Sequence, residues 1–166
     1  LKVKLVAGTI QPITSQGQCV SVDQLESPVA GFVGQNKGYF FRKRYKVATK
    51  FVDHFSRLSY VYLQESTKGA QTLVAKRSFK AYASTDGVKI RHCHADNGRF
   101  AEELFLNYCE LAGQKVSLCG VSAHFQNGIA ERRIKDLTER SPTSLLHAVH
   151  RWPSAITINL WPYALR

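Results

Sequence analysis

The sequence predicts an α/β protein with a five-stranded mixed sheet, in which three antiparallel strands are followed by two parallel strands and flanked by helices. Three observations support this class. The first 64 residues contain three short segments rich in β-branched and aromatic residues. The later residues alternate helical spacing with short apolar segments. The chain has 166 residues, 44% of them hydrophobic, which is enough for one domain with a substantial core.

The first half of the chain carries three strand candidates joined by short connections. Residues 19–25 (CVSVDQL) alternate apolar and polar side chains, and we expect Ser27-Pro28 to end this strand. Residues 45–53 and 58–64 are the next two candidates, with a hairpin connection at 53–57. The three strands therefore form an antiparallel meander.

The second half alternates helices and strands. We expect helices over 66–84, around 100–111 and from 127 onward, and strands over 88–95 and 115–119. Gly113 closes the second helix and Asn127 caps the third. Pro142 should kink or split the third helix, since an interior proline costs roughly 3 kcal/mol. The apolar stripes of the helices are Ala75, Phe79, Tyr82 and Ala83, then Phe100, Leu104, Tyr108 and Leu111, then Ala130, Ile134 and Leu137.

Charge points to a polyanionic partner. Lys and Arg number 23 against 12 Asp and Glu, so the net charge is +11. On so small a domain this favours nucleic acid, although a merely soluble basic protein is the simpler interpretation. No apolar run approaches the roughly 18–20 residues of a membrane span. The first residues also lack the apolar stretch of a signal peptide.

The four cysteines give no sign of disulfides or of a zinc motif. None of Cys19, Cys93, Cys109 and Cys119 forms a CxxC pair, and we expect them to be reduced and buried. His92-Cys93-His94 invites a zinc interpretation. Adjacent strand residues point to opposite faces, however, so a strand that leads into a site is the better interpretation.

Three acids stand where this order of elements would bring them together. Asp23 lies in the first strand, Asp96 directly follows the fourth, and Glu131 falls near the start of the third helix. Ligands on such sheets bind at the carboxyl ends of the strands. Three clustered carboxylates repel one another unless a cation compensates them, and oxygen ligands favour Mg²⁺ or Mn²⁺. Taken singly, each acid is better explained by turn or helix-start chemistry, and only the three together, in this order, point to a site.

Five segments carry a resemblance to a known family. They are VDQLESP, FVDHFSRLSYVY, HADNGRF, HFQNGIAERRI and NLWPYAL. From about Cys19 to its end, the chain resembles the integrase catalytic core of copia-type LTR retrotransposons, and more distantly that of retroviruses. The 34 residues between Asp96 and Glu131 are close to the family's usual gap. The resemblance implies an RNase H-like fold.

The resemblance also implies an activity and its partners. It implies a polynucleotidyl transferase in which Asp23, Asp96 and Glu131 hold Mg²⁺ or Mn²⁺. A water would process the 3′ ends of the element's DNA, and the new 3′-hydroxyl would then attack target DNA. The implied partners are DNA and further copies of the chain, with no small-molecule substrate and no membrane. The family acts inside the cell, in virus-like particles and the nucleus.

By the same resemblance, residues 1–17 are expected to be a linker from an upstream zinc-binding domain. Residues 18–166 are expected to be the catalytic core, truncated at its C-terminal end. Two positions depart from the family pattern. Arg99 stands where the family often has Glu, and Pro142 interrupts a helix that is usually continuous. Both departures are typical of a decaying element copy, so ancestry is a firmer inference than activity.

Several residues are candidates for contacting DNA. Lys135 lies one turn after Glu131 and either contacts a phosphate or pairs with Glu131. Arg132 adds charge, which a solvated helix face explains nearly as well. The remaining candidates are His124, Gln126 and Asn127 before the helix, and Lys37, Arg42, Lys43 and Arg44 in a basic segment.

Two other functions stay open. One is a different nuclease on the same fold, such as an RNase H, although the Asp-Asn-Gly and Gln-Asn-Gly-Ile-Ala-Glu segments argue for an integrase. The other is a non-catalytic DNA-binding or multimerisation module left by a dead element. Persistent DNA binding without metal-dependent strand cutting would favour this module.

Overall fold

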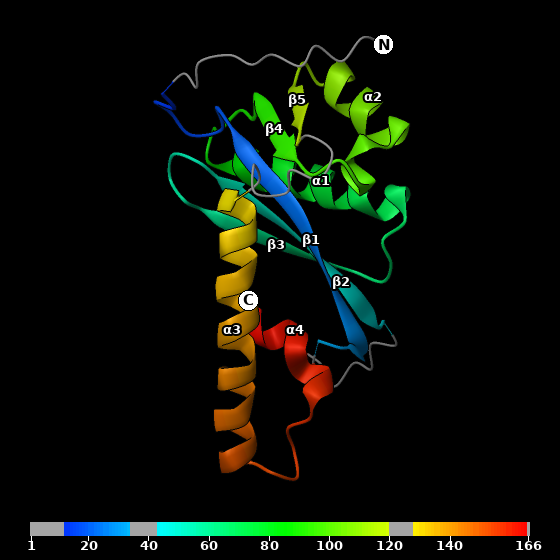
Figure 1. Ribbon diagram of the computed structural model, residues 1–166, viewed down its shortest axis with the longest axis vertical. Coiled ribbons are helices and arrows are strands. Elements are labelled where there is room, and N and C mark those ends of the chain that lie inside the picture. Colours follow the sequence, from blue (N-terminus) through cyan, green and yellow to red (C-terminus); the bar gives the residue numbers. More distant parts are fainter. Residues whose placement is uncertain (1–11, 34–42, 120–127, 166) are drawn as a thin grey trace.

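A five-stranded mixed sheet forms the centre of the molecule (Figure 1). The computed structural model describes residues 12–33, 43–119 and 128–165, apart from the side chains of Ala130, Arg133 and Leu137. The strand order is β3-β2-β1-β4-β5. Pairing is antiparallel between β1, β2 and β3 and parallel between β1, β4 and β5, which confirms the predicted sheet. The strands are β1 (Val20–Gly31), β2 (Tyr45–Asp53), β3 (Ser59–Gln64), β4 (His92–Ala95) and β5 (Lys115–Leu118).

Helices lie on both faces of this sheet, as its parallel half requires. The four α-helices are α1 (Gly69–Thr85), α2 (Glu103–Leu111), α3 (Gly128–Arg151) and α4 (Trp161–Ala164), with 3₁₀ turns η1 (Arg99–Ala101) and η3 (Ile158–Leu160). Helices α1 and α2 cover the main core, which includes Val22, Phe51, Phe79 and Phe105. Helices α3 and α4 lie on the opposite face, where Trp161 heads a second cluster. No described helix is long and apolar enough to cross a membrane.

Strand β1 is longer than predicted. Ser27-Pro28 does not end it, because the strand continues to Gly31. The register with β2 shifts between Glu26 and Gly31, so Pro28 lies in an irregular stretch where its missing N–H breaks no regular ladder. The pairing with β4 covers only Val20 to Val22. Asp23 is therefore not at the end of β1, but at the point where β1 loses its parallel neighbour.

The predicted apolar stripe of α2 is partly wrong. Leu104 is 48% exposed and Leu111 is 89% exposed. The buried side carries Phe105 and Cys109 instead. The cause is Glu102, whose extended backbone (φ −63°, ψ 139°) separates the turn containing Phe100 from α2 and changes the helical phase. Gly113 ends this segment with a φ of +66°, as predicted.

The prediction that Pro142 would split the third helix is also wrong. Helix α3 runs from Gly128 to Arg151 as one element, and Figure 1 shows a single straight helix. Pro142 removes the hydrogen bond to the carbonyl of Thr138. Both residues are exposed, so water can satisfy that carbonyl and the local cost does not break the helix.

The C-terminal segment packs on the far end of β1. The indole Nε1 of Trp161 donates to the carbonyl of Val29 at 2.9 Å, and Asn159 Nδ2 donates to that of Ala30 at 2.9 Å. A Cβ at Gly31 would lie 2.3 Å from Trp161 Nε1, so only glycine allows this approach. This docking closes the second hydrophobic cluster beside α3.

Candidate active site

The sheet brings Asp23 and Asp96 to the same edge. In the parallel pair of β1 and β4, Ser21 is level with His94 and Val22 is level with Ala95. Asp23 and Asp96 follow these two pairs directly. Neighbouring strands lie about 4.8 Å apart, and both acids share the face of Ser21 and His94. The expectation that the first and fourth strands are neighbours is therefore confirmed.

Glu131 approaches this edge from the first turn of α3. Cys119 lies beside the two aspartates. It follows β5 level with Asp96, and its N–H donates to the carbonyl of Ala95 at 2.9 Å. Burial raises the pKa of the Cys119 thiol, and so do the negative charges of Asp96, Glu131 and Asp23. The three carboxylates thus lie within electrostatic range of one thiol.

Asp96 is held in an unusual environment. Its Oδ1 is buried and has no hydrogen-bond partner among the described residues. Buried polar atoms are nearly always bonded, so such an oxygen is suited to an additional ligand. A Cβ at Gly98 would lie 3.1 Å from Asp96 Oδ2, which explains the glycine of the Asp-Asn-Gly segment. On the neighbouring strand, Asp23 Oδ1 accepts the backbone N–H of Gln24 at 2.7 Å.

The donor set suits a hard divalent cation. No group of three or more His, Cys, Asp and Glu side chains in the described ranges is arranged to hold a metal ion. Asp23, Asp96 and Glu131 are therefore not arranged as a three-ligand set in the described part of the chain. Mg²⁺ does not need one, because it usually takes one or two protein carboxylates together with waters and substrate phosphates. The partnerless oxygen of Asp96 and the oxygen-only chemistry of the three acids fit such an ion.

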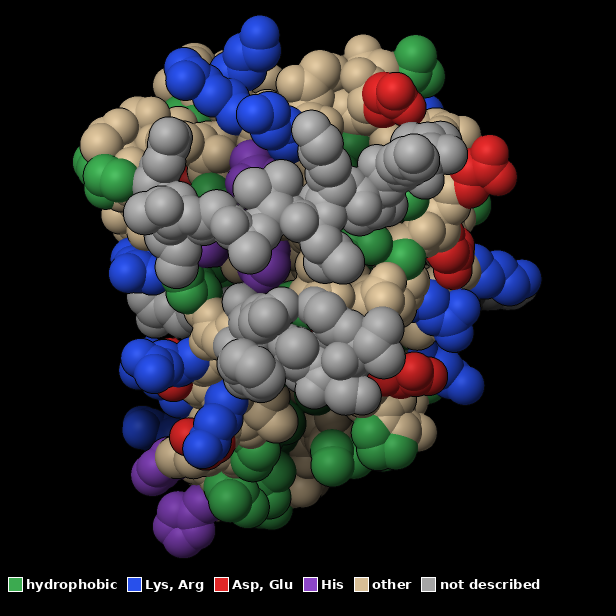
Figure 2. Space-filling model, turned by 45° about the horizontal axis from the view of Figure 1, so that its top comes forward, with side chains coloured by type: hydrophobic (Ala, Val, Ile, Leu, Met, Phe, Trp, Pro, Cys, Tyr) green, Lys and Arg blue, Asp and Glu red, His purple; other side chains and the backbone are tan. Residues whose placement is uncertain are grey.

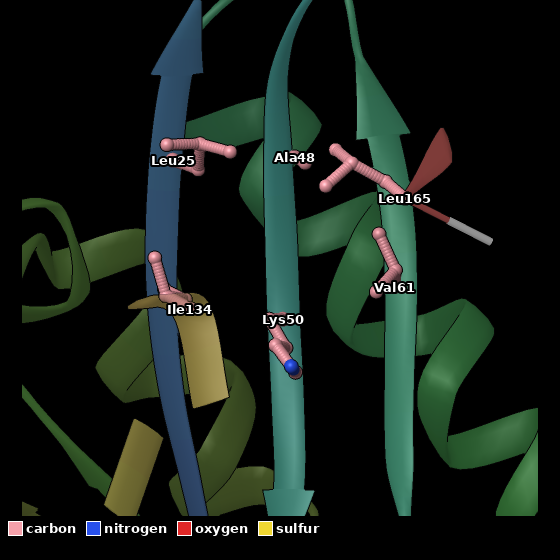
Figure 3. A pocket seen from close by; sticks show the side chains of 6 residues that line it. All are labelled: Leu25, Ala48, Lys50, Val61, Ile134 and Leu165. Carbon is pink, nitrogen blue, oxygen red and sulfur yellow. The ribbon is translucent and has the colours of Figure 1, made fainter. Parts of the chain in front are cut away.

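Lys50 is a member of this neighbourhood that the sequence analysis missed. It is the direct antiparallel partner of Asp23 and is only 3% exposed. Figure 3 shows its side chain in a small pocket with Leu25 and Ala48, beneath Ile134 of α3. The sequence did contain a signal for it, because Lys50 lies between Ala48 and Val52 on the same inward-facing side of the strand. A lysine at this cross-strand position is of the right charge to offset negative charge at Asp23.

Asp53 and the His-Cys-His segment were also candidates for metal ligands. Asp53, an outside candidate for a fourth acid, accepts hydrogen bonds from the N–H of Gly17 at 2.9 Å and of Ser56 at 2.7 Å, so it stabilises turns. His92 and His94 share one face of β4 while Cys93 is buried on the other, which supports the strand interpretation over zinc. All four cysteines are free and buried, as expected.

The structure describes some of the residues predicted to contact DNA and leaves others outside the described ranges. Lys135 forms an ion pair with Glu139 (3.8 Å), so it turns away from the alternative pairing with Glu131. Arg132 is exposed on the first turn of α3. Lys43 and Arg44 precede β2 at the end opposite Asp23, and the Arg44 guanidinium lies 5.2 Å from the ring of Phe32. His124, Gln126, Asn127, Lys37 and Arg42 lie outside the described residues.

Solved structures share the fold of this chain. The HTLV-2 integrase catalytic core in complex with magnesium, in its trimeric form, superposes with a TM-score of 0.57 and 22% identity, over 90% of this chain and 82% of that chain. An integrase chain of the simian T-cell lymphotropic virus intasome gives a TM-score of 0.65 and 16% identity, over 95% and 50%. The BIV integrase catalytic core gives 0.55 and 16%, over 90% and 81%.

This chain has the fold of a retroviral integrase catalytic core. The predicted RNase H-like class is thereby confirmed. No protein-family model matches the sequence, and no curated protein does. At these identities the likeness shows the integrase fold alone, so the chemistry has to be argued from the residues themselves. Related integrase cores occur in dimeric and trimeric forms, and the two HTLV-2 forms were solved with magnesium.

Proposed function

We propose that this chain is the catalytic core of a copia-type retroelement integrase, which processes the 3′ ends of element DNA and joins them to target DNA. The observation that carries the proposal is the position of Asp23 and Asp96 at the strand edge where the parallel pairing of β1 and β4 ends, with Glu131 near enough to affect the pKa of the Cys119 thiol beside them. The integrase fold supports it. So do the Asp-Asn-Gly and Gln-Asn-Gly-Ile-Ala-Glu segments that hold the second and third acids.

The three acids would hold Mg²⁺ or Mn²⁺. When bound, such ions make an attacking oxygen more nucleophilic and stabilise the leaving oxygen on phosphorus. Asp96 offers Oδ1, which is already desolvated and has no described partner. The N–H of Gln24 orients Asp23 by bonding its Oδ1. Gln24 is itself held, because its Nε2 donates to Thr49 Oγ1 and Thr72 Oγ1, both at 3.0 Å.

DNA is the proposed substrate, and a homo-oligomer is the proposed working form. A net charge of +11 favours a polyanion even though the site itself is acidic. Arg132 and Lys135 on α3 lie one residue and one turn beyond Glu131, where they would contact phosphate beside the acids. By family resemblance, the proposed places of action are virus-like particles and the nucleus.

Asp96→Asn tests the catalytic role most directly. The substitution removes a charged ligand at nearly equal volume. Metal-dependent strand transfer on duplex DNA should therefore fall by at least about 100-fold, equivalent to about 2.7 kcal/mol of transition-state stabilisation. The assay measures joined product with Mg²⁺ or Mn²⁺. Asp86→Asn makes the same chemical change at the exposed end of α1 and should leave the rate unchanged.

Three outcomes would overturn the proposal. Full activity of the Asp96→Asn protein would remove the metal-ligand role. Cleavage of RNA–DNA hybrids in preference to DNA joining would assign the site to an RNase H-type nuclease. DNA binding by the unmodified chain without any metal-dependent cutting would assign it to the non-catalytic module.

A further inference from the structure

A group of histidines and serines lies beside the acids on the same face of the sheet. We call it the histidine shelf, and it consists of Ser21, His54, His92, His94 and Ser117. His54 Nε2 is 2.7 Å from Ser21 Oγ, His92 Nε2 is 2.8 Å from Ser117 Oγ, and His94 Nδ1 is 2.7 Å from the same oxygen. The three rings are half-buried, so they are fixed in place yet reachable from solvent.

Two cations, Arg57 and Lys115, lie within electrostatic range of the histidine shelf. Burial lowers the pKa of His54, and so do the charges of His94 and Arg57, while Asp53 has the opposite effect. Burial also lowers the pKa of His92, together with His94 and Lys115. The carboxylate of Asp53 already accepts bonds from Gly17 and Ser56. Figure 2 shows histidines on this face with Lys and Arg side chains above them. The missing partner of such a surface is an anion.

The hydrogen bonds leave donors free for that anion. His54 and His92 each use Nε2 for a serine, and neither Nδ1 has a hydrogen-bond partner among the described residues. Where a serine hydroxyl donates to Nε2, the ring proton of a neutral imidazole lies on Nδ1. An Nδ1–H is a good donor to a phosphate oxygen and needs no ring charge.

The histidine shelf is continuous with the acidic edge. His94 and His92 precede Asp96 by two and four residues on the same face of β4. At the strand rise they lie about 7 Å and 13 Å from it along the strand. A DNA strand advances about 3.4 Å per nucleotide, so the longer of these distances, from His92 to Asp96, corresponds to roughly four nucleotides.

We propose that the histidine shelf binds the backbone phosphates of the DNA strand whose scissile phosphate lies at Asp23 and Asp96, with Arg57 and Lys115 as flanking cations. The inference rests on the proposed function for the identity of the strand. A metal ion is the weaker occupant, because each histidine already uses a ring nitrogen for a serine hydroxyl. The shelf positions the strand by its backbone and carries no base specificity.

The test measures affinity for a fluorescein-labelled DNA duplex by anisotropy, in EDTA and above the ordinary imidazole pKa of about 6.5. The double substitution His54→Ala with His92→Ala should weaken binding about tenfold, through the loss of two charge-assisted donors. Lys115→Ala should reduce the slope of log affinity against log salt by about 0.9. His150→Ala, on the distal exposed turn of α3, is the matched control and should bind as the unmodified chain does.

Further variants separate contact from folding. His92→Gln keeps an N–H donor and should retain most of the affinity, whereas a general loss of structure would also appear in circular dichroism. Folded shelf variants with unchanged affinity and salt slope would overturn the shelf. The binding assay contains no metal, so it tests the shelf independently of catalysis. If the shelf variants bind DNA more weakly but the unmodified chain never cuts DNA, the proposed function is refuted and the shelf is supported.

Discussion

The two faces of strands β1 and β4 differ completely in chemistry although their residues alternate along the same chain. Val20, Val22, Cys93 and Ala95 face α1 and α2 and are fully buried in the main core. The residues between them on β1 are Ser21 and Asp23, and those on β4 are His92 and His94. One face therefore stabilises the sheet by apolar packing, while the other holds polar groups at positions which that packing has fixed.

The apolar face also contains a buried charge. Lys76 of α1 is fully buried, donates from Nζ to the Cys93 sulfur, and lies 5.9 Å from the centre of the Phe51 ring. The pKa of Cys93 is lowered to about 6. A hydrogen bond from the Cys109 thiol lowers it most, and the Lys76 charge lowers it further, while burial acts in the opposite direction. A buried ammonium needs such a partner, since an unpaired charge in a core is strongly destabilising.

The largest expected effect comes from breaking the apolar face. Phe51 is 0% exposed and stacks on Phe79 with ring centres 4.5 Å apart. Phe51→Ala should lower the free energy of unfolding by about 3–5 kcal/mol, because it removes buried surface and leaves a cavity. Urea denaturation measures the change. Phe55→Ala is the control, because Phe55 is 52% exposed and its loss should cost no more than about 0.5 kcal/mol. Equal costs would contradict the assignment of the core.

Much of the apolar face could be predicted from sequence. Alternation in CVSVDQL and density of aromatic residues in 45–53 and 58–64 indicated the strands, because packing against helices requires those residue types. Strand β2 has the predicted bounds, Tyr45–Asp53. The failures came where long-range contacts outweigh local pattern. Trp161 docks on Val29 and so extends β1 past Pro28, an interaction across 132 positions that no local rule contains.

The polar face was predictable in part. The acids stood out because Asp23 lies in the first strand, Asp96 follows a strand and Glu131 begins a helix, and the sheet order then placed the strands of Asp23 and Asp96 side by side. Lys50 and the shelf serines were missed, because their importance depends on which strands are neighbours. The residues near Lys50 in the sequence do not indicate that it pairs with Asp23 across the sheet. The Lys76–Cys93 contact, which joins α1 to β4, was hidden for the same reason.

A smaller effect should distinguish the faces at alkaline pH. Burial, with the charges of Cys93 and Asp53, raises the pKa of Cys19 from 9.0 to about 11. The thiol lies at the start of the polar face, 4.0 Å from His54 Nε2. Below pH 9 the thiol is protonated in both states. Between pH 9 and 11 only the unfolded chain ionises, so the free energy of unfolding should fall as pH rises, by up to about 2.7 kcal/mol.

Urea denaturation under reducing conditions at several pH values from 8 to about 11 measures this slope. Cys19→Ala should flatten the decline, and the difference between the two proteins isolates the thiol from Lys and Tyr ionisation. Cys119 should contribute in the same direction, since its pKa is raised too. A steeper decline in the Cys19→Ala protein would show that Cys19 is not protected from ionisation by the fold.

The smallest expected effect on stability belongs to the acid that should matter most for activity. Asp96 Oδ1 is buried without a described partner, and Asp23 and Glu131 add negative charge nearby. In the absence of metal, Asp96→Asn removes repulsion and no described hydrogen bond to Oδ1. The free energy of unfolding should therefore stay within about 1 kcal/mol of its original value or increase. Urea denaturation in EDTA measures it.

Divalent metal sharpens this last contrast. An ion that binds only the folded protein stabilises it by an amount that grows with the ratio of its concentration to its dissociation constant. Mg²⁺ should therefore raise the unfolding free energy of the unmodified chain, and raise that of the Asp96→Asn protein less. Loss of more than about 2 kcal/mol in EDTA would mean that Asp96 supports the fold itself. The contrast between a face that stabilises the fold and a face that carries the chemistry would then not hold at Asp96, on which the proposed chemistry depends.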